Sequence, residues 1–156
     1  MTYIHTVASI NTNGIWNDTR IRMLEDFLWT NDIDIALLRE ITFPQLYSIR
    51  RYTKEVNIGN KRRGAAILAK DGLALTDIRR LPSWRGMTAT YNGTCLLNLY
   101  APSVAERRQY RECFYNVDVP HLLPATQTDL TLSSQGISTA CCHIPLAQGK
   151  GTIVEH

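Results

Sequence analysis

The chain lacks any long apolar run, and its start lacks the pattern of a targeting segment. None of its hydrophobic stretches approaches the roughly 18 consecutive apolar residues of a membrane span. No basic region followed by an apolar stretch opens the sequence. We therefore expect a soluble, untargeted protein that makes no contact with a membrane, and nothing in the sequence indicates a particular protein partner.

The cysteines also lack a recognisable arrangement. Cys95, Cys113, Cys141 and Cys142 show neither the paired spacing of a metal site nor a secretory context. This usage is typical of buried or free thiols in a reducing compartment, and it argues against a disulfide framework. We therefore expect the protein to lie inside the cell.

Extreme charge is absent as well. The 156 residues are 44% hydrophobic and 20% charged, which is typical of one globular domain with one core. The formal net charge of +3 permits a polyanionic partner such as nucleic acid but does not require one.

Two apolar runs flank an amphipathic segment in the first quarter of the chain. Residues 2–10 are rich in β-branched and apolar side chains and give way to an Asn/Gly cluster, which predicts a strand and a turn. Apolar positions at helical spacing predict a helix over Asp18–Thr30, and residues 33–38 predict a short buried strand. In such a strand-helix-strand unit the strands are parallel, so Asn11 and Glu40 are expected at the same carboxyl edge.

Shorter runs follow at hairpin-like intervals. They predict strands over residues 52–56, 64–70, 73–80, 86–91 and 94–100. Asp71-Gly72 and Asn92-Gly93 favour tight turns between antiparallel strands, so a meander is expected. A helical pattern covers residues 104–116, and residues 122–132 can hold a helix end and one more strand. Beyond residue 132 no periodicity remains, and we assign that segment no secondary structure.

Four ordered segments carry a family resemblance. They are Ile10-Asn-Thr-Asn-Gly-Ile15, Ile33-Asp-Ile-Ala-Leu-Leu-Arg-Glu40, Arg63-Gly-Ala-Ala-Ile-Leu68 and Leu97-Asn-Leu-Tyr-Ala-Pro-Ser103. Their order and separations resemble the amino-terminal part of an endonuclease/exonuclease/phosphatase domain, specifically the apurinic-endonuclease-like domain of non-LTR (LINE-type) retrotransposons. The resemblance implies an α/β fold, an incomplete two-sheet sandwich of the DNase I-like type. It covers residues 1–132, and we treat residues 133–156 as an anomalous tail.

The resemblance also implies roles for three residues. Glu40 matches the family's ligand for Mg²⁺, a cation that takes one or two carboxylates and keeps waters and phosphate oxygens as its other ligands. Asn11 matches the Asn that orients the network around the metal or the nucleophile, and Tyr100 matches a tyrosine that stabilises charge on the scissile phosphate. The alternatives stay open: a solvated strand end for Glu40, a turn-forming side chain for Asn11 and an ordinary half-buried strand residue for Tyr100.

Two basic stretches are candidates for contact with nucleic acid. Lys61, Arg62 and Arg63 precede a predicted strand and can contact DNA phosphates, although such a triplet is more often a solvated loop. Arg79, Arg80 and Arg85 surround Trp84, which can stack on a splayed base, but the structural reading is favoured there too. His5 and His121 lie outside the family motifs and are expected to be structural.

The chain departs from the family where a Gly-Asp-Phe-Asn motif should follow residues 130–132. The later metal-binding acid and the terminal Ser-Asp-His motif are also missing. Residues 135–142 can be encoded so that a shift of one nucleotide reads Gly-Asp-Phe-Asn-Cys-Val-Leu, and we therefore hypothesise a frameshifted, truncated gene copy. If this frameshift is real, the truncated chain is expected to expose apolar faces that the missing half would cover, and to be poorly soluble for that reason.

These observations favour a Mg²⁺-dependent, DNA-nicking endonuclease-like domain of retrotransposon origin, truncated and catalytically impaired. Two alternatives remain. One is a noncatalytic remnant that binds nucleic acid, and the other is a phosphatase of the same superfamily. The first predicts DNA affinity without Mg²⁺-dependent nicking. The residues that would separate a nuclease from a phosphatase lie largely outside the segments that match.

Overall fold

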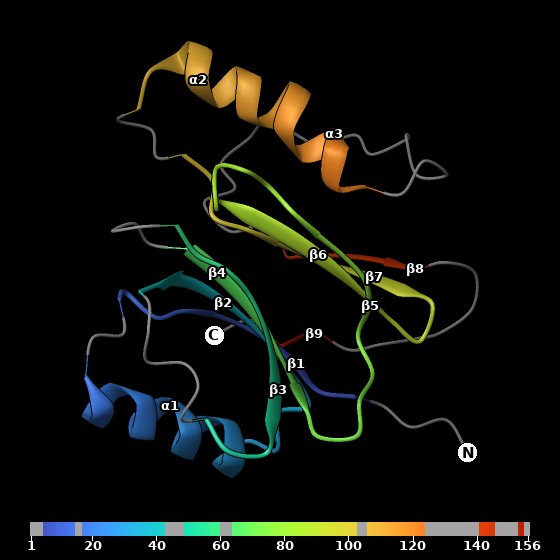
Figure 1. Cartoon of the computed structure of the whole chain (residues 1–156). Helices are drawn as coiled ribbons and strands as arrows, with labels where there is room; N and C mark the ends of the chain where they lie inside the picture. The colour runs from blue at the N-terminus through green and yellow to red at the C-terminus, as the bar shows by residue number, and fades with distance from the viewer. Residues whose placement is uncertain are drawn as a thin grey trace.

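Two β-sheets pack face to face and carry helices on their outer faces (Figure 1). The computed structural model describes residues 5–14, 17–42, 49–59, 64–102, 106–123, 141–145 and 153–154. The first half contains β1 (Val7–Asn11), α1 (Asp18–Thr30), β2 (Ile35–Ile41), β3 (Tyr52–Asn57) and β4 (Gly64–Lys70). The rest contains β5 (Thr76–Arg80), β6 (Gly86–Tyr91), β7 (Thr94–Leu99), α2 (Arg108–Cys113), the π-helical turn η2 (Phe114–Asp118), α3 (Val119–Leu122), β8 (Cys141–Pro145) and β9 (Ile153–Val154).

The strand order divides the chain between the two sheets. The first sheet runs β3-β4-β2-β1-β9, and the second runs β5-β6-β7-β8. The strands β1 and β2 are parallel neighbours, as predicted, with Val7 opposite Ile35 and Asn11 opposite Arg39. All other pairs are antiparallel except β1 with β9. The described strands and helices confirm the predicted two-sheet α/β sandwich.

Three apolar layers follow from alternation along the strands. Side chains on one face of the first sheet pack against α1, through Ile21, Leu24 and Leu28 of the helix. The other face packs against the second sheet, where Ile35, Leu37, Ile67, Met87, Ala89 and Leu96 meet. The outer face of the second sheet is covered by η2 and α3, and Phe114 is fully buried there. Both faces of β2 and β4 are therefore buried, which explains why their sequences are almost continuously apolar.

The helix α1 has the predicted bounds, and local chemistry sets its start. Asn17 accepts a hydrogen bond from the main-chain N–H of Arg20 at 2.9 Å, which is an N-cap interaction. In the described part of the chain, no helix is both long and apolar enough to cross a membrane.

Two predicted turns have different outcomes. Asn92 and Gly93 both have positive φ, 47° and 75°, and connect β6 to β7 as a two-residue hairpin. The prediction for Asp71-Gly72 is wrong. The main-chain N–H of Leu73 donates to Lys70 O in a tight turn, but the strands on either side, β4 and β5, belong to different sheets. This turn carries the chain from one sheet to the other.

The last part of the chain also differs from expectation. The sequence predicts one helix over residues 104–116, whereas regular helix begins at Arg108 and continues through the π-helical turn to Leu122. No periodicity indicates structure beyond residue 132, yet β8 pairs antiparallel with β7, and β9 pairs in parallel with Val7 and Ala8 of β1. The division at residue 132 and the frameshift stay predictions, because residues 124–140 lie outside the described part.

Candidate metal and phosphate site

The carboxyl ends of β1 and β2 bring two predicted site residues together. Asn11 ends β1, and its Nδ2 donates a hydrogen bond to Oε1 of Glu40 at 3.1 Å. The expected proximity of these side chains is therefore confirmed. Their chemical roles stay predictions. We call this end of the first sheet the site edge.

Glu40 lies in a β-bulge. Its φ is +56°, in the left-handed region, and the pairing of β2 with β4 shifts register between Arg39 and Ile41. Ala36, Leu38 and Ile41 all face α1, so one extra residue interrupts the alternation, and that residue is Glu40. Bulges re-aim side chains next to active sites, and positive φ has a conformational cost for a glutamate. The local geometry therefore holds Glu40 at the edge rather than in the apolar layer.

The loop after β1 supports this bulge. Thr12 Oγ1 donates to Arg39 O at 2.9 Å, and Gly14 N donates to Glu40 O at 2.9 Å. Asn13 N donates to Asn11 Oδ1 at 2.9 Å, so the Asn11 amide is oriented with its Nδ2 toward Glu40. These bonds fix both Asn11 and Glu40 through the main chain.

The donor set at the site edge fits a weakly held Mg²⁺. One carboxylate is enough when the cation keeps waters and substrate oxygens in its coordination shell. No group of three or more His, Cys, Asp or Glu side chains capable of holding a metal occurs among residues whose placement is described. Among the described residues, Glu40 would therefore hold a cation as a single carboxylate rather than as part of a closed cage.

Tyr100 follows β7 and is held by the second sheet. Its main-chain N–H donates to Arg85 O at 2.7 Å. The Arg85 guanidinium carbon lies 5.1 Å from the centroid of the Tyr100 ring and 5.8 Å from that of Tyr110. Arg85 Nη2 also pairs with Glu106 Oε1 at 3.1 Å. Cation–π contact and an ion pair thus fix the surroundings of Tyr100.

Sequence reasoning missed Asn98, although it lies in a segment that was singled out. Its Nδ2 donates to Leu38 O at 2.9 Å and to Ala66 O at 2.8 Å, across the gap between the sheets. The available signal was an amide among the buried apolar residues of β7. A polar side chain buried in such a strand must find partners.

Of the two basic stretches, the structure describes the second. Lys61, Arg62 and Arg63 lie outside the described residues. In the second basic stretch, Arg79 pairs with Asp77 and Arg80 pairs with Glu55. Trp84 lies against Gly59, where an added Cβ would come within 2.2 Å of its ring. These contacts support the structural reading of the second stretch.

The end of the first sheet opposite the site edge holds a second polar cluster. His5 contacts Tyr91 and Asp34, with His5 Nε2 3.0 Å from Tyr91 Oη and His5 Nδ1 3.4 Å from Asp34 Oδ2. Lys70 Nζ bridges Asp34 and Asp32. The hydrogen bond to Asp32 is the main cause of a raised pKa for Lys70. His5 is thus structural in its contacts, as expected, and lies away from Glu40.

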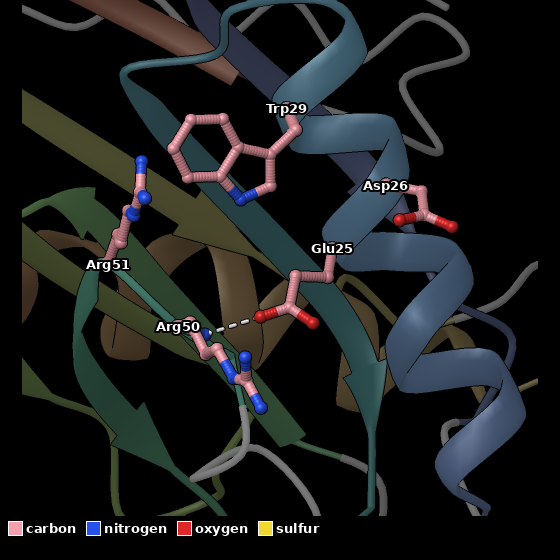
Figure 2. A pocket seen from close by; sticks show the side chains of 5 residues that line it. All are labelled: Glu25, Asp26, Trp29, Arg50 and Arg51. Carbon is pink, nitrogen blue, oxygen red and sulfur yellow. Dashed lines mark hydrogen bonds between the residues drawn. The ribbon is translucent and has the colours of Figure 1, made fainter.

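A shallow hollow of about 360 Å³ lies beside the second half of α1. Figure 2 shows its five lining side chains: Glu25, Asp26, Trp29, Arg50 and Arg51. Arg50 N donates to Glu25 Oε1 at 2.7 Å, and Arg51 lies 4.5 Å over the Trp29 ring. The loop of the site edge contacts the start of α1 instead, where Arg20 Nη1 donates to Gly14 O at 2.9 Å. The hollow is therefore separate from the predicted site.

Comparisons with known proteins identify the fold through structure alone. No protein-family model matches the chain, and no curated protein sequence matches it. An AP endonuclease from Archaeoglobus fulgidus superposes with a TM-score of 0.62 at 21% identity, over 77% of this chain and 51% of that one.

Two further solved structures agree. A 3′ phosphatase from Neisseria, NExo, bound to a product DNA hairpin gives a TM-score of 0.59 at 18% identity, over 74% of this chain and 50% of that one. Humanized D. rerio TDP2 with 14 mutations gives 0.55 at 16% identity, over 74% and 54%. The chain spans about half the length of these structures. It therefore has the two-sheet α/β fold of the endonuclease/exonuclease/phosphatase superfamily, the DNase I-like fold.

Proposed function

We propose that the site edge is the metal-binding half of a Mg²⁺-dependent phosphodiester-hydrolysing site that acts on DNA. The observation that carries this proposal is the Asn11–Glu40 hydrogen bond at a bulge where Glu40 has a left-handed main chain. Support also comes from the solved structures with the same fold, which include an AP endonuclease and a phosphatase bound to DNA. The ordered sequence motifs favour the retrotransposon branch of this superfamily.

Each residue has a distinct part in this proposal. Glu40 is the protein ligand, and Asn11 holds one of its carboxylate oxygens so that the group stays at the edge. A bound Mg²⁺ would supply a Lewis acid for the phosphate oxygens. Tyr100 offers a hydroxyl that donates to a phosphate oxygen as negative charge increases.

We further propose that this chain hydrolyses DNA weakly at most. Acid-base chemistry at a phosphate needs a positioned proton donor or acceptor. His5 is engaged by Tyr91 and Asp34, away from the site edge. The Gly-Asp-Phe-Asn motif that the family resemblance leads us to expect after residues 130–132 is absent there. We therefore expect this chain to bind metal and phosphate but to turn over slowly.

A nicking assay on supercoiled plasmid tests the proposal. The wild type is compared with Glu40→Ala and with Asp26→Ala, which changes net charge equally at an exposed position on α1. We expect Mg²⁺-dependent nicking or, where turnover is undetectable, Mg²⁺-dependent retention of DNA on a filter. Either signal should be lost in Glu40→Ala and kept in Asp26→Ala. A Mg²⁺-dependent signal that survives loss of Glu40 contradicts the proposal.

A phosphatase of the same superfamily is the second candidate. The similarity to the Neisseria 3′ phosphatase favours it. A DNA hairpin carrying a 3′ phosphate separates the two candidates, because a phosphatase releases inorganic phosphate and leaves the strand length unchanged. A nuclease shortens the strand or opens the plasmid.

A further inference from the structure

Asn98 is a buried amide on the inner face of β7. The residue is 1% exposed, and it lies two positions after Leu96, on the face of β7 that packs between the sheets. Both amide hydrogens are used, to Leu38 O and to Ala66 O. Its Oδ1 is buried without a hydrogen-bond partner among the described residues. A leucine would avoid this unpaired acceptor, so packing stability alone does not account for an amide here.

Asn98 joins its own strand, β7, to β2, and these two strands lead to the two sides of the proposed site. Asn98 lies two residues before Tyr100, and Leu38 lies two residues before Glu40. The strands β2 and β7 belong to different sheets, so no main-chain ladder sets their separation. Side chains between the sheets must do so. The bond from Asn98 to Leu38 O crosses the gap one strand repeat away from the site.

We propose that Asn98 is a positioning residue that fixes the separation between the Glu40 carboxylate and the Tyr100 hydroxyl. The role rests on the proposed function, because it gives Glu40 the metal and Tyr100 the phosphate. Asn98 itself contacts neither ligand. It holds β2 and β7 at one relative position across the gap between the sheets. A cation at Glu40 and a phosphate at Tyr100 would then lie at a fixed distance from each other.

The chain offers a matched control in Asn57. This side chain is also buried, and its Nδ2 donates to two main-chain carbonyls across the sheets, Leu81 O and Gly86 O, both at 2.9 Å. It joins the end of β3 to Leu81, which follows β5, and to Gly86, the first residue of β6. Its amide therefore holds the sheets together without linking the strands of Glu40 and Tyr100.

The test uses Tb³⁺, a hard cation that prefers oxygen ligands as Mg²⁺ and Ca²⁺ do. Light absorbed by a nearby tyrosine is transferred to bound Tb³⁺, and the emission falls steeply with distance. The emission lost in Tyr100→Phe is the part that Tyr100 sensitises. The emission lost in Glu40→Ala is the part that comes from Tb³⁺ bound at Glu40. We expect Asn98→Leu to lose the Tyr100 part while Tb³⁺ affinity is retained, and Asn57→Leu to keep it.

Hydrogen exchange supplies a readout that needs no metal. The N–H of Tyr100 donates to Arg85 O, and the N–H of Gly14 donates to Glu40 O. Both amides should exchange faster in Asn98→Leu than in Asn57→Leu. If Asn98→Leu does not fold, Asn98→Thr retains one donor and should give a smaller change of the same kind.

The outcomes separate this inference from the proposed function. Faster exchange in the Asn98 variant alone, with Tb³⁺ bound equally by wild type and Glu40→Ala, supports positioning and overturns the metal site. Unchanged exchange at Tyr100 and Gly14 overturns positioning. Equal losses in the Asn98 and Asn57 variants also overturn it, because general loosening of the sheets then explains the effect.

Discussion

Replacement of Glu40 by glycine removes the carboxylate and also removes the Cβ that disfavours a left-handed main chain. Glu40 has φ of +56°, and this conformation costs an L-residue about 1–2 kcal/mol. Glycine avoids this cost, but relative to alanine it destabilises the folded state by about 0.5–1 kcal/mol, because its unfolded chain has more conformational entropy to lose. Glu40→Gly should therefore be about 0.5–1 kcal/mol more stable than Glu40→Ala. Both variants lose the bond to Asn11, so the comparison isolates the main chain.

Urea and thermal unfolding measure this difference. In a chain of this size the melting temperature should rise by about 2 °C from Ala to Gly at position 40. Thr53 provides the control, because it is exposed in the regular strand β3 and has no positive φ. There, Gly should be less stable than Ala by about 0.5–1 kcal/mol. If Ala is as stable as Gly at position 40, the residue is not held in a left-handed bulge.

Three further predictions concern the packed interior. Gly59→Ala should destabilise by about 1–3 kcal/mol in urea, because the new Cβ meets the Trp84 ring; a neutral result contradicts this packing. Burial raises the pKa of the Cys95 thiol, so peptide mapping after iodoacetamide treatment should find exposed Cys113 modified before buried Cys95; earlier modification of Cys95 would contradict this. Burial also raises the pKa of the Tyr52 phenol above 10.0. The unfolded phenol then loses its proton first, and stability falls as pH rises through about 10. Tyr52→Phe should lose less stability over that range, and an equal loss would count against the prediction.

Local patterns predicted the part of the fold that local chemistry determines. Apolar spacing predicted α1, which starts at the Asn17 cap, and the Asn92-Gly93 dipeptide predicted the β6–β7 hairpin, where both residues have positive φ. The parallel unit β1-α1-β2 then placed Asn11 beside Glu40. These predictions needed only turn chemistry, periodicity and a rule for adjacent strands.

The remaining features of the fold depend on pairing between strands that are distant in sequence, and local patterns do not predict such pairing. The Asp71-Gly72 turn forms, but the turn alone does not specify which strand pairs with which, and β4 and β5 enter different sheets. The same limit hid β8, whose pairing with β7 leaves no periodic signal in its own sequence. The bulge at Glu40 and the cross-sheet bonds of Asn98 depend on contacts with distant strands. Sequence therefore indicated candidate residues for the site, whereas the sheets determine how they are held.

Divalent-cation binding at Glu40 is the central claim, and Mn²⁺ titration followed by electron paramagnetic resonance tests it most directly. Mn²⁺ replaces Mg²⁺ at oxygen sites, and the free ion has a signal that binding suppresses. We predict that Glu40→Gln, which keeps the shape but removes the charge, abolishes binding. Asn11→Ala should weaken binding about 10- to 100-fold, as expected for a residue that orients a ligand. Wild-type affinity in Glu40→Gln would contradict the account.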